Sequence, residues 1–284
     1  LQVNENDTQI HIKGREFAYT IDKRTALFTE MKFAGREYLN HPMELNIWRA
    51  PTDNDMYIKS EWKKGHYDKA YTRAYTTEVV QGKHGVKITS HASVVAETVQ
   101  KILDVMITWK IEVAGKIDAD IAVTKDDEFP DLPRFGVRMF LDKKLSAVRY
   151  FGMGPQESYC DKHQASSHGL YQANVDDLHE DYIRPQENGS HYDCEYVELN
   201  NSRYGIVASA EKAFSFNASY YTQEELEKKT HNYELTESDS VVFCVDYALN
   251  GIGSNSCGPV VLDQYRFNDV LFRFQFTLVP YVKG

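Results

Sequence analysis

The stretch LDVMITWKIEV, residues 103–113, decides the class of fold that this sequence predicts. Six apolar side chains, from Leu103 to Val113, occupy every second position in it. Alternation with a period of two is the pattern of a β-strand that buries one face of its sheet. The residues Ala114-Gly115-Lys116 then turn the chain, and residues 117–123 alternate in the same way. The sequence therefore centres on two sheet strands joined by a tight turn.

Similar patterns continue on both sides of this stretch. Two strand pairs are predicted in residues 9–39, with turns at Lys13-Gly14 and Ala34-Gly35. Further strands are predicted over residues 134–141, 194–199, 204–209, 213–219, 241–249 and 270–278. Helices are predicted over residues 60–70, with Ser60 as N-cap, and over 223–231, which a capping box opens. Many strands and few helices predict an all-β antiparallel fold with one or two short helices, in a single domain spanning residues 1–284.

The composition argues against several classes of partner and location. The formal net charge of −10 argues against nucleic acid, because affinity for a phosphate backbone depends on Lys and Arg. No apolar run approaches the roughly 18 residues of a membrane span, and the first residues do not have the pattern of a signal peptide. The four cysteines form no CxxC pair, which favours free thiols in a reducing cytoplasm. The chain does not begin with Met, which favours a domain of a longer protein.

Residues 151–189, FGMGPQESYCDKHQASSHGLYQANVDDLHEDYIRPQENG, form the longest segment without a sustained period of 2 or 3.6. Loops of this length tend to carry function or to be disordered. Disorder is disfavoured here because the segment holds several aromatic side chains, among them Tyr159 and Tyr182. It is also rich in polar groups that could face a sugar. The segment is therefore the first place to look for a site.

Glu157 and Glu187 are the candidates for chemistry in this segment. Two carboxylates on either side of a glycosidic bond are the machinery of a glycosidase, and the intervening chain could bring these two together. Alternatively, each carboxylate accepts hydrogen bonds from backbone N–H groups of the irregular segment. The residues alone favour this second interpretation.

Metal and nucleophile sites have weaker support. The run Asp53-Asn54-Asp55 lacks the following Gly and the distal Glu of an EF-hand, so a polar turn is favoured. His163 and His168 could ligate a metal together with Asp161, but the absence of paired cysteines favours surface histidines. Cys257 has no charged neighbour in the sequence that would activate it as a nucleophile.

Four stretches, taken in order, carry a resemblance to a known family. They are WRAPTDND (48–55), WKKGHY (62–67), FGMGPQESYCD with RPQENG (151–161 and 184–189), and GIGSNSCGP (251–259) followed by residues 265–276. Together they resemble the C-terminal small-chain domain of the glycoside hydrolase family 2 β-galactosidases. The resemblance implies an antiparallel supersandwich of the galactose-mutarotase-like kind. It also implies a catalytic TIM barrel outside these residues, which carries both catalytic glutamates and the sites for Mg²⁺ and Na⁺.

The resemblance also implies where this chain meets the substrate. In the family, a Trp in the loop that corresponds to GIGSNSCGP stacks on the sugar, and Cys257 stands at that position here. We expect Cys257, Asn255 and Ser256 to contact substrate, and we expect no catalytic residue, metal ligand or cofactor in this chain. Residues expected in a pocket or at an interface are Arg49, Asp53, Asn54, Gln156, Glu157, Glu187 and Asn188.

The expected function is that of the C-terminal domain or separate small subunit of a β-galactosidase. The full enzyme would hydrolyse terminal non-reducing β-D-galactose residues, in lactose for example, with retention through a covalent intermediate. This chain would complete the mouth of the active site and support oligomeric assembly. Its partners would be the catalytic portion and the galactoside, and alone it would be inactive.

Two alternatives belong to other classes of protein. A stand-alone, mutarotase-like aldose epimerase needs a general acid and a general base beside the ring oxygen, and none of the ten histidines is placed convincingly for that role. A non-catalytic carbohydrate-binding module would bind galactose or lactose by itself. From the sequence, we expect the chain not to bind them.

Overall fold

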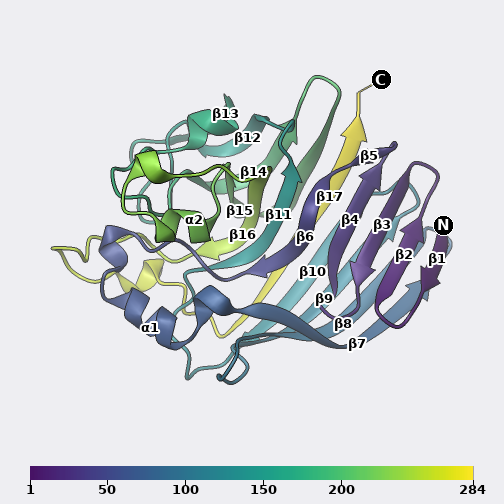
Figure 1. The fold of residues 1–284 in the computed structure, drawn as a ribbon, viewed down its shortest axis with the longest axis horizontal. Coiled ribbons are helices and arrows are strands. Elements are labelled where there is room, and N and C mark those ends of the chain that lie inside the picture. The colour runs from purple at the N-terminus through teal and green to yellow at the C-terminus, as the bar shows by residue number, and fades with distance from the viewer. Residues whose placement is uncertain (284) are drawn as a thin grey trace.

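The computed structural model describes residues 1–283 and contains two β-sheets (Figure 1). The smaller sheet consists of β1 (Gln2–Glu5), β2 (Gln9–Lys13), β3 (Phe17–Asp22), β4 (Leu27–Phe33) and β5 (Arg36–Glu37). Each strand pairs antiparallel with the next one along the chain. The turns at Lys13-Gly14 and Ala34-Gly35 are confirmed, and Gly35 adopts a positive φ of 76°.

The larger sheet contains twelve strands, and its main path has nine of them. In spatial order the path is β13 (Ser167–Asn174), β12 (Ala147–Gly154), β14 (Ser190–Asn200), β15 (Tyr204–Ser219), β17 (Leu271–Val282), β10 (Ile117–Lys125), β9 (Leu103–Glu112), β8 (Gly85–Val95) and β7 (Tyr71–Gln81). The predicted strands at 103–113 and 117–123 are β9 and β10, and their Cα register pairs Ile117 with Ile111. The predicted all-β antiparallel fold is confirmed.

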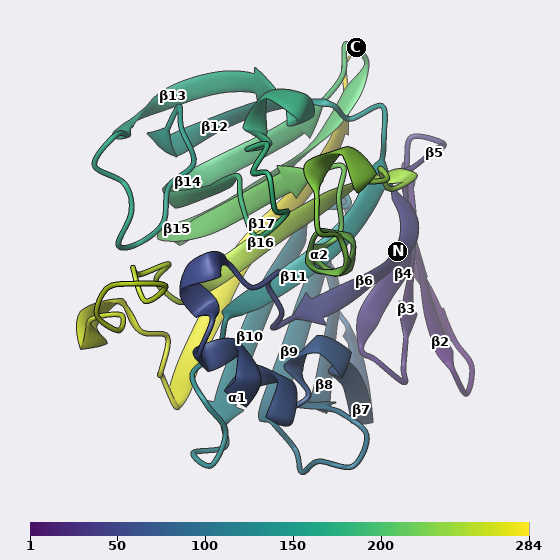
Figure 2. The same ribbon diagram turned by 60° about the vertical axis from the view of Figure 1, so that its left-hand side comes forward.

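The larger sheet forks at β15. Residues 204–209 of β15 pair with β17, whereas residues 215–219 pair with β16 (Ser240–Leu249). From β16 a second branch continues through β11 (Arg134–Asp142) to β6 (Leu39–Asn46), and Figure 2 shows these three strands side by side. Nearly all residues of β11 and β16 are buried, so this branch lies in the interior.

One hydrophobic core joins the two sheets. Trp109 of β9 packs edge-on against Phe28 of β4, with ring centroids 4.9 Å apart, and its indole N–H donates to the carbonyl of Ala26 at 2.8 Å. Trp109 also packs edge-on against Phe276 of β17, with ring centroids 6.3 Å apart. The buried face of the alternating stretch 103–113 is therefore the surface on which the smaller sheet packs.

The helices are short. They are α1 (Ile58–Lys64), α2 (Gln223–Lys228) and the 3₁₀ helices η1 (Asp53–Asp55), η2 (Tyr67–Lys69), η3 (Val175–Leu178), η4 (Asn232–Glu234) and η5 (Asp263–Tyr265). The prediction that Ser60 caps a helix over residues 60–70 was wrong, because α1 begins at Ile58 and Gly65 already ends it. The N-cap of α2 is confirmed, since Thr222 Oγ1 accepts from the N–H of Glu225 at 3.1 Å. The full capping box does not form, because the Glu225 side chain instead accepts from the N–H of Thr236, and the helix ends at Lys228 rather than at the predicted residue 231. Within residues 1–283, no helix has the length and apolar character needed to span a membrane.

The sequence missed several strands for identifiable reasons. The edge strands β7 and β13 are mostly exposed, so their residues show little apolar alternation. Strand β8 does alternate, but Ser90 and Ala92 occupy buried positions where larger apolar residues would have marked it. The segment 151–189 is ordered, as expected, but β12 and β13 occupy part of it. Residues 204–219 form one long strand where two were predicted.

Candidate functional site

Four segments that are distant in the sequence meet to form what we call the loop cluster: residues 49–55, 156–162, 182–189 and 250–258. In Figures 1 and 2 the yellow-green loop that follows β16 lies beside the blue segment that leads into α1. Hydrogen bonds and ion pairs from side chains, rather than a β-ladder, hold these segments together.

Arg49 is fully buried and fixes the start of the loop 250–258. Its guanidinium binds Asp55 in a bidentate pair, with Nη2–Oδ1 at 2.7 Å and Nε–Oδ2 at 3.1 Å. The same guanidinium donates to the carbonyls of Asn250 (2.5 Å) and Gly251 (3.1 Å). A buried charge is tolerated when a counter-ion and hydrogen bonds satisfy it in this way. Arg49 therefore holds the loop 250–258 to the segment 49–55 from inside the protein and does not line a pocket.

Asp161 and Asn54 hold the next part of that loop. The carboxylate of Asp161 accepts from the backbone N–H groups of Ile252 (2.9 Å) and Gly253 (2.7 Å). Asn54 donates from Nδ2 to the carbonyl of Gly253 at 2.7 Å, and its Oδ1 accepts from Ser256 Oγ at 2.8 Å. The irregular loop 250–258 is thus shaped by side chains from the other segments.

Glu157 lies within the cluster and accepts four hydrogen bonds. Its Oε1 accepts from Lys162 Nζ and from the Tyr182 hydroxyl, both at 2.5 Å. Its Oε2 accepts from the Tyr159 hydroxyl at 3.2 Å and from the N–H of Gly189 at 2.9 Å. Burial alone would raise the pKa of Glu157, but the Lys162, Tyr182 and Gly189 donors outweigh it and lower that pKa. Glu157 is therefore a carboxylate at neutral pH that caps the backbone, as the second interpretation predicted.

Glu187 belongs to a buried ion-pair network. Its Oε1 accepts from Arg134 Nη1 at 2.9 Å, and Arg134 also binds Asp246 through Nη2 at 2.6 Å. The backbone N–H of Glu187 donates to the carbonyl of Ala50 at 3.0 Å, which ties the segment 182–189 to 49–55. Burial raises the pKa of Glu187, while the positive charges of Arg134 and Arg49 act in the opposite sense.

A hollow of about 310 Å³ opens between these segments. Its lining residues are Thr52, Asp53, Asn54, Glu157, Tyr159, Lys162, Tyr182, Gln186, Glu187, Ile252 and Ser256. Five of the residues predicted for a pocket or a substrate contact are thus brought together: Asp53, Asn54, Glu157, Glu187 and Ser256. Sequence reasoning did not select Tyr159, Lys162 or Tyr182. Tyr159 stands within the GPQESYCD motif, and that proximity was the only signal for it.

The opposite pKa shifts of Glu157 and Glu187 suggest the acid and base of a hydrolase, but the contacts do not support those roles. Both oxygens of Glu157 are occupied by donors of the protein itself. Glu187 is 4% exposed and holds the guanidinium of Arg134. A catalytic carboxyl must reach the scissile bond. The hollow therefore offers polar groups that can bind hydroxyls, from Asp53, Asn54 and Lys162, but neither of the two candidate carboxyls, Glu157 and Glu187, is free for catalysis.

The other predicted residues lie outside the lining of the hollow. Gln156 is exposed. Asn188 is buried, where its Oδ1 accepts from the N–H of Glu180 at 3.0 Å and its carbonyl accepts from Asn217 Nδ2 at 2.6 Å. Asn255 and Cys257 belong to the outer part of the loop 250–258, and Cys257 is exposed. Arg49 and Asn188 therefore shape the cluster from within, and Cys257 faces outward.

Within residues 1–283, no group of three or more His, Cys, Asp or Glu side chains is arranged to hold a metal ion. The candidate ligands each have another partner. His163 Nδ1 lies 2.9 Å from the carbonyl of Tyr159, and His168 Nε2 lies 3.1 Å from that of Asp193. Asp161 is committed to the loop 250–258. These contacts favour the structural interpretation of the three residues.

Comparison with known proteins identifies the family. The family model described as "Beta galactosidase small chain" matches residues 13–278. The chain belongs to the β-galactosidase small-chain family. The β-galactosidase of Actinobacillus pleuropneumoniae is 44% identical over 278 residues, which are 98% of this chain and 27% of the relative. That of Staphylococcus xylosus is 33% identical over 97% of this chain and 28% of the relative. The chain thus spans just over a quarter of the length of these relatives.

Two solved structures share the fold of this small chain at low sequence identity. A galactose mutarotase-like protein from Lactobacillus casei is 14% identical, with a TM-score of 0.50 over 97% of this chain and all of the other. A galactose 1-epimerase from Lactobacillus acidophilus is 8% identical, with a TM-score of 0.52 over all of this chain and 98% of the other. The likeness concerns the fold alone, and it confirms the predicted mutarotase-like supersandwich.

Proposed function

We propose that this chain completes the active site of a β-galactosidase whose catalytic glutamates lie in a separate catalytic portion. The full enzyme hydrolyses terminal non-reducing β-D-galactose residues of β-galactosides. The loop cluster carries the proposal, because it is a polar-lined rim in which the protein's own donors hold Glu157 and Glu187. The relatives, which bear the name β-galactosidase and are almost four times as long, support a partner region beyond these residues.

Exposed apolar side chains beside the loop cluster support docking to that catalytic portion. Met56 and Tyr57 follow the segment 49–55, and they are 42% and 61% exposed. Val260 and Leu262 follow the loop 250–258, and they are 70% and 61% exposed. Asn54 ties the two segments together through Gly253 and Ser256. Exposed apolar residues gathered beside a polar rim are typical of a protein interface.

The proposed division of labour follows from what each part can supply. Retaining hydrolysis needs two carboxyl groups about 5 Å apart across the bond, and we assign both to the catalytic portion together with Mg²⁺ and Na⁺. This chain supplies the wall of the pocket. The exposed outer loop, with Asn255, Ser256 and Cys257, is the part that we assign to contact with the galactoside. Oligomeric assembly in the reducing cytoplasm is part of the same proposal, and the four free cysteines support such a compartment.

The test is complementation in solution. The pure chain is expected to give no turnover of a chromogenic β-galactoside above the buffer control, since donors of the protein itself hold the two candidate carboxyls, Glu157 and Glu187. Adding the separately produced catalytic portion of the same enzyme should restore turnover, and titration should saturate at one chain per catalytic portion. Stoichiometric turnover by the pure chain would contradict the proposal, as would a catalytic portion that is fully active without it.

The epimerase alternative has less support. It requires a general acid and a general base facing one sugar ring, and none of the residues that line the hollow is a histidine. Polarimetry on freshly dissolved α-galactose distinguishes the two functions, because only an epimerase would accelerate the change in optical rotation. We expect no acceleration.

A further inference from the structure

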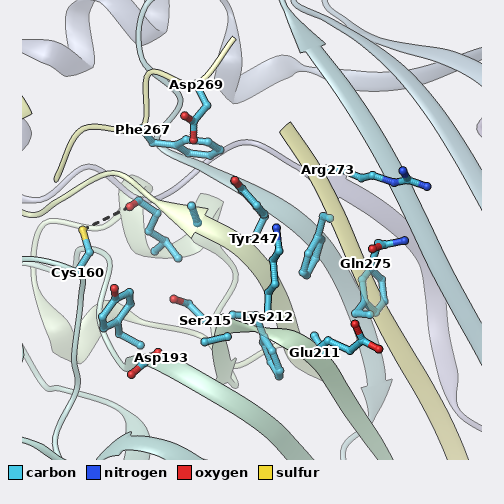
Figure 3. Close-up of a pocket in the computed structure, with 18 of the residues that line it drawn as sticks. Cys160, Asp193, Glu211, Lys212, Ser215, Tyr247, Phe267, Asp269, Arg273 and Gln275 are labelled. Carbon is cyan, nitrogen blue, oxygen red and sulfur yellow. Dashed lines mark hydrogen bonds between the residues drawn. The ribbon is translucent and has the colours of Figure 1, made fainter. Parts of the chain in front are cut away.

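The fork in the larger sheet creates a second and larger hollow. The ladder between β15 and β17 stops at Ser209 and Thr277, and the ladder between β15 and β16 begins at Ser215. Residues 210–214 pair with neither β16 nor β17, and the two branches diverge from there. The space between them is a cleft of about 670 Å³, shown in Figure 3, which we call the fork cleft. Its volume is within the range of roughly 300–1,000 Å³ typical of sites for small molecules.

Aromatic rings bridge the fork and form part of its lining. Tyr247 of β16 stacks on Phe272 of β17 with centroids 4.9 Å apart and an interplanar angle of 16°. Phe267 and Phe274 contact the same tyrosine at 5.8 and 6.1 Å. Tyr247 is only partly buried and lies near the centre of Figure 3. A half-exposed tyrosine presents an apolar ring and a polar hydroxyl together, which suits the C–H face and the hydroxyls of a sugar.

The charges around the fork cleft nearly balance. Its lining includes four cationic residues, Lys110, Lys212, Arg266 and Arg273, and five acidic residues, Asp118, Asp120, Asp193, Glu211 and Asp269. Several of these are already paired: Arg273 binds Asp120, and Arg266 binds Asp131 at 2.6 Å. A site for a phosphate or sulfate group would show an excess of free Arg and Lys. The balance favours an uncharged ligand.

Four charged side chains at the fork cleft have no partner of their own. Glu211 and Lys212 come from the unpaired part of β15, Asp269 comes from the loop before β17, and Lys110 comes from β9. None of the four takes part in a side-chain hydrogen bond or ion pair among the 283 residues that the structure describes, and all four are exposed. In Figure 3 the Lys212 side chain extends toward Tyr247. Burial, and then the charge of Asp269, raise the pKa of Tyr247, so its hydroxyl stays protonated as a donor.

We propose that the fork cleft binds a neutral saccharide, a hexose or a hexose disaccharide, against Tyr247 and between Glu211, Lys212 and Asp269. A sugar needs both donors and acceptors at short range, and these side chains supply both. Binding requires only this chain, so the inference goes beyond the proposed function. It also reverses the expectation from the sequence that the chain alone does not bind galactose or lactose.

The experiment uses the whole chain with galactose and lactose as probes, in saturation-transfer NMR and calorimetry. The expected dissociation constant is on the order of 1 mM, as for a neutral sugar in a cleft that is open to solvent. The double variant Glu211→Ala/Lys212→Ala should weaken binding about tenfold, and Tyr247→Phe, which keeps the ring, about threefold. Asp53→Ala, in the other hollow, is the matched control and should bind as the unmodified chain does. Galactose 6-sulfate should bind no more tightly than galactose.

Three results would overturn the proposal. The first is no saturation transfer from the folded chain at tens of millimolar sugar, which is roughly tenfold above the expected constant. The second is binding that Asp53→Ala abolishes and Glu211→Ala/Lys212→Ala leaves intact, because the sugar would then occupy the hollow of the loop cluster. The third is much tighter binding of the sulfated sugar. Complementation of the catalytic portion is measured separately with the same double variant, and we expect full restoration of turnover. A failure of the proposed sugar site and a failure of the proposed function therefore show up in different experiments.

Discussion

The loop cluster and the fork cleft share a wall at Tyr159, which lines both hollows, yet their charged side chains differ in one respect. In the loop cluster Arg49, Glu157 and Asp161 find all their main partners inside the protein. In the fork cleft Glu211 and Lys212 find none among residues 1–283. A network whose charged groups are all paired within the protein, which we call a closed network, holds the loops in one conformation. Such a fixed surface is suited to packing against the catalytic portion of an enzyme. Charged side chains without a partner in the protein, such as Glu211 and Lys212, can instead bind a ligand.

The largest expected effect concerns the closed network. Arg134→Ala should lower the free energy of unfolding by about 3–5 kcal/mol, because it leaves the carboxylates of Glu187 and Asp246 buried without the guanidinium that binds both of them. Both side chains and Arg134 are at most 4% exposed. Denaturation with urea, followed by circular dichroism, measures the change.

Arg273→Ala is the matched control for that variant. Arg273 also forms a bidentate pair, with Asp120, but its side chain is 61% exposed. An exposed pair contributes about 0–1 kcal/mol. If Arg134→Ala and Arg273→Ala lowered the free energy of unfolding equally, the buried ion pairs of the loop cluster would be no more stabilising than the exposed pair at the fork cleft. The contrast between the two regions would then be wrong.

Glu157→Gln should have an intermediate effect that depends on pH. Its carboxylate accepts charge-assisted hydrogen bonds, so near neutral pH the variant should lose roughly 1.5–3 kcal/mol. The pKa of Glu157 in the folded chain lies below the ordinary value of 4.5. The unfolded chain therefore binds the proton first as pH falls, and the contribution is complete above 4.5 and disappears as pH falls through the lower folded value.

Urea titrations of both proteins between pH 7 and pH 3 would check this sign. The difference in unfolding free energy between unmodified chain and Glu157→Gln should shrink only on the acidic side of 4.5. A difference that shrank on raising the pH would show that Glu157 is protonated in the fold. That result would restore it as a candidate acid.

Asn54→Ala should have a smaller effect on stability and a local effect on the loop 250–258. The variant removes the bonds to Gly253 and Ser256, and it should cost about 1 kcal/mol overall. The backbone N–H of Ser256 also donates to Asn54 Oδ1 at 3.3 Å, so hydrogen exchange at that amide should quicken, while the amide of Ile252, held by Asp161, stays protected. Unchanged exchange at Ser256 would mean that the loop holds its shape without Asn54. Titration against the catalytic portion should show weaker complementation.

The contrast also explains what the sequence could predict. Strands β9 and β10 were predicted because each buries one face, which imposes alternation on local sequence. Edge strands such as β7 and β13 bury little, so no such constraint marks them. The predicted break between residues 209 and 213 had a physical cause, although the chain is one strand there. It is the place where β15 leaves β17 for β16, and Glu211 and Lys212 occupy it.

The two hollows also differed in how far the sequence could predict them. The loop cluster could be predicted in part because its residues lie in short motifs that resemble a known family, and Asp53, Asn54 and Glu157 do line its hollow. The contacts of Glu157 with Lys162 and Tyr182 could not be predicted, since they depend on how the segments fold together. The fork cleft had no local signal. It arises from the registers of β15 with two different strands, which are long-range features.

The smallest expected effect is the one that most sharply tests the comparison. Glu211→Ala and Lys212→Ala should each change the free energy of unfolding by less than about 0.5 kcal/mol, because neither side chain has a partner to lose and both are exposed. A structural role would couple loss of sugar binding to loss of stability, whereas a ligand site loses binding alone. Urea denaturation of the two variants, set beside their calorimetry with galactose, separates these cases. A destabilisation above about 1 kcal/mol for either variant would place it in a closed network like that of Glu157, and the fork cleft would no longer be the open counterpart of the loop cluster.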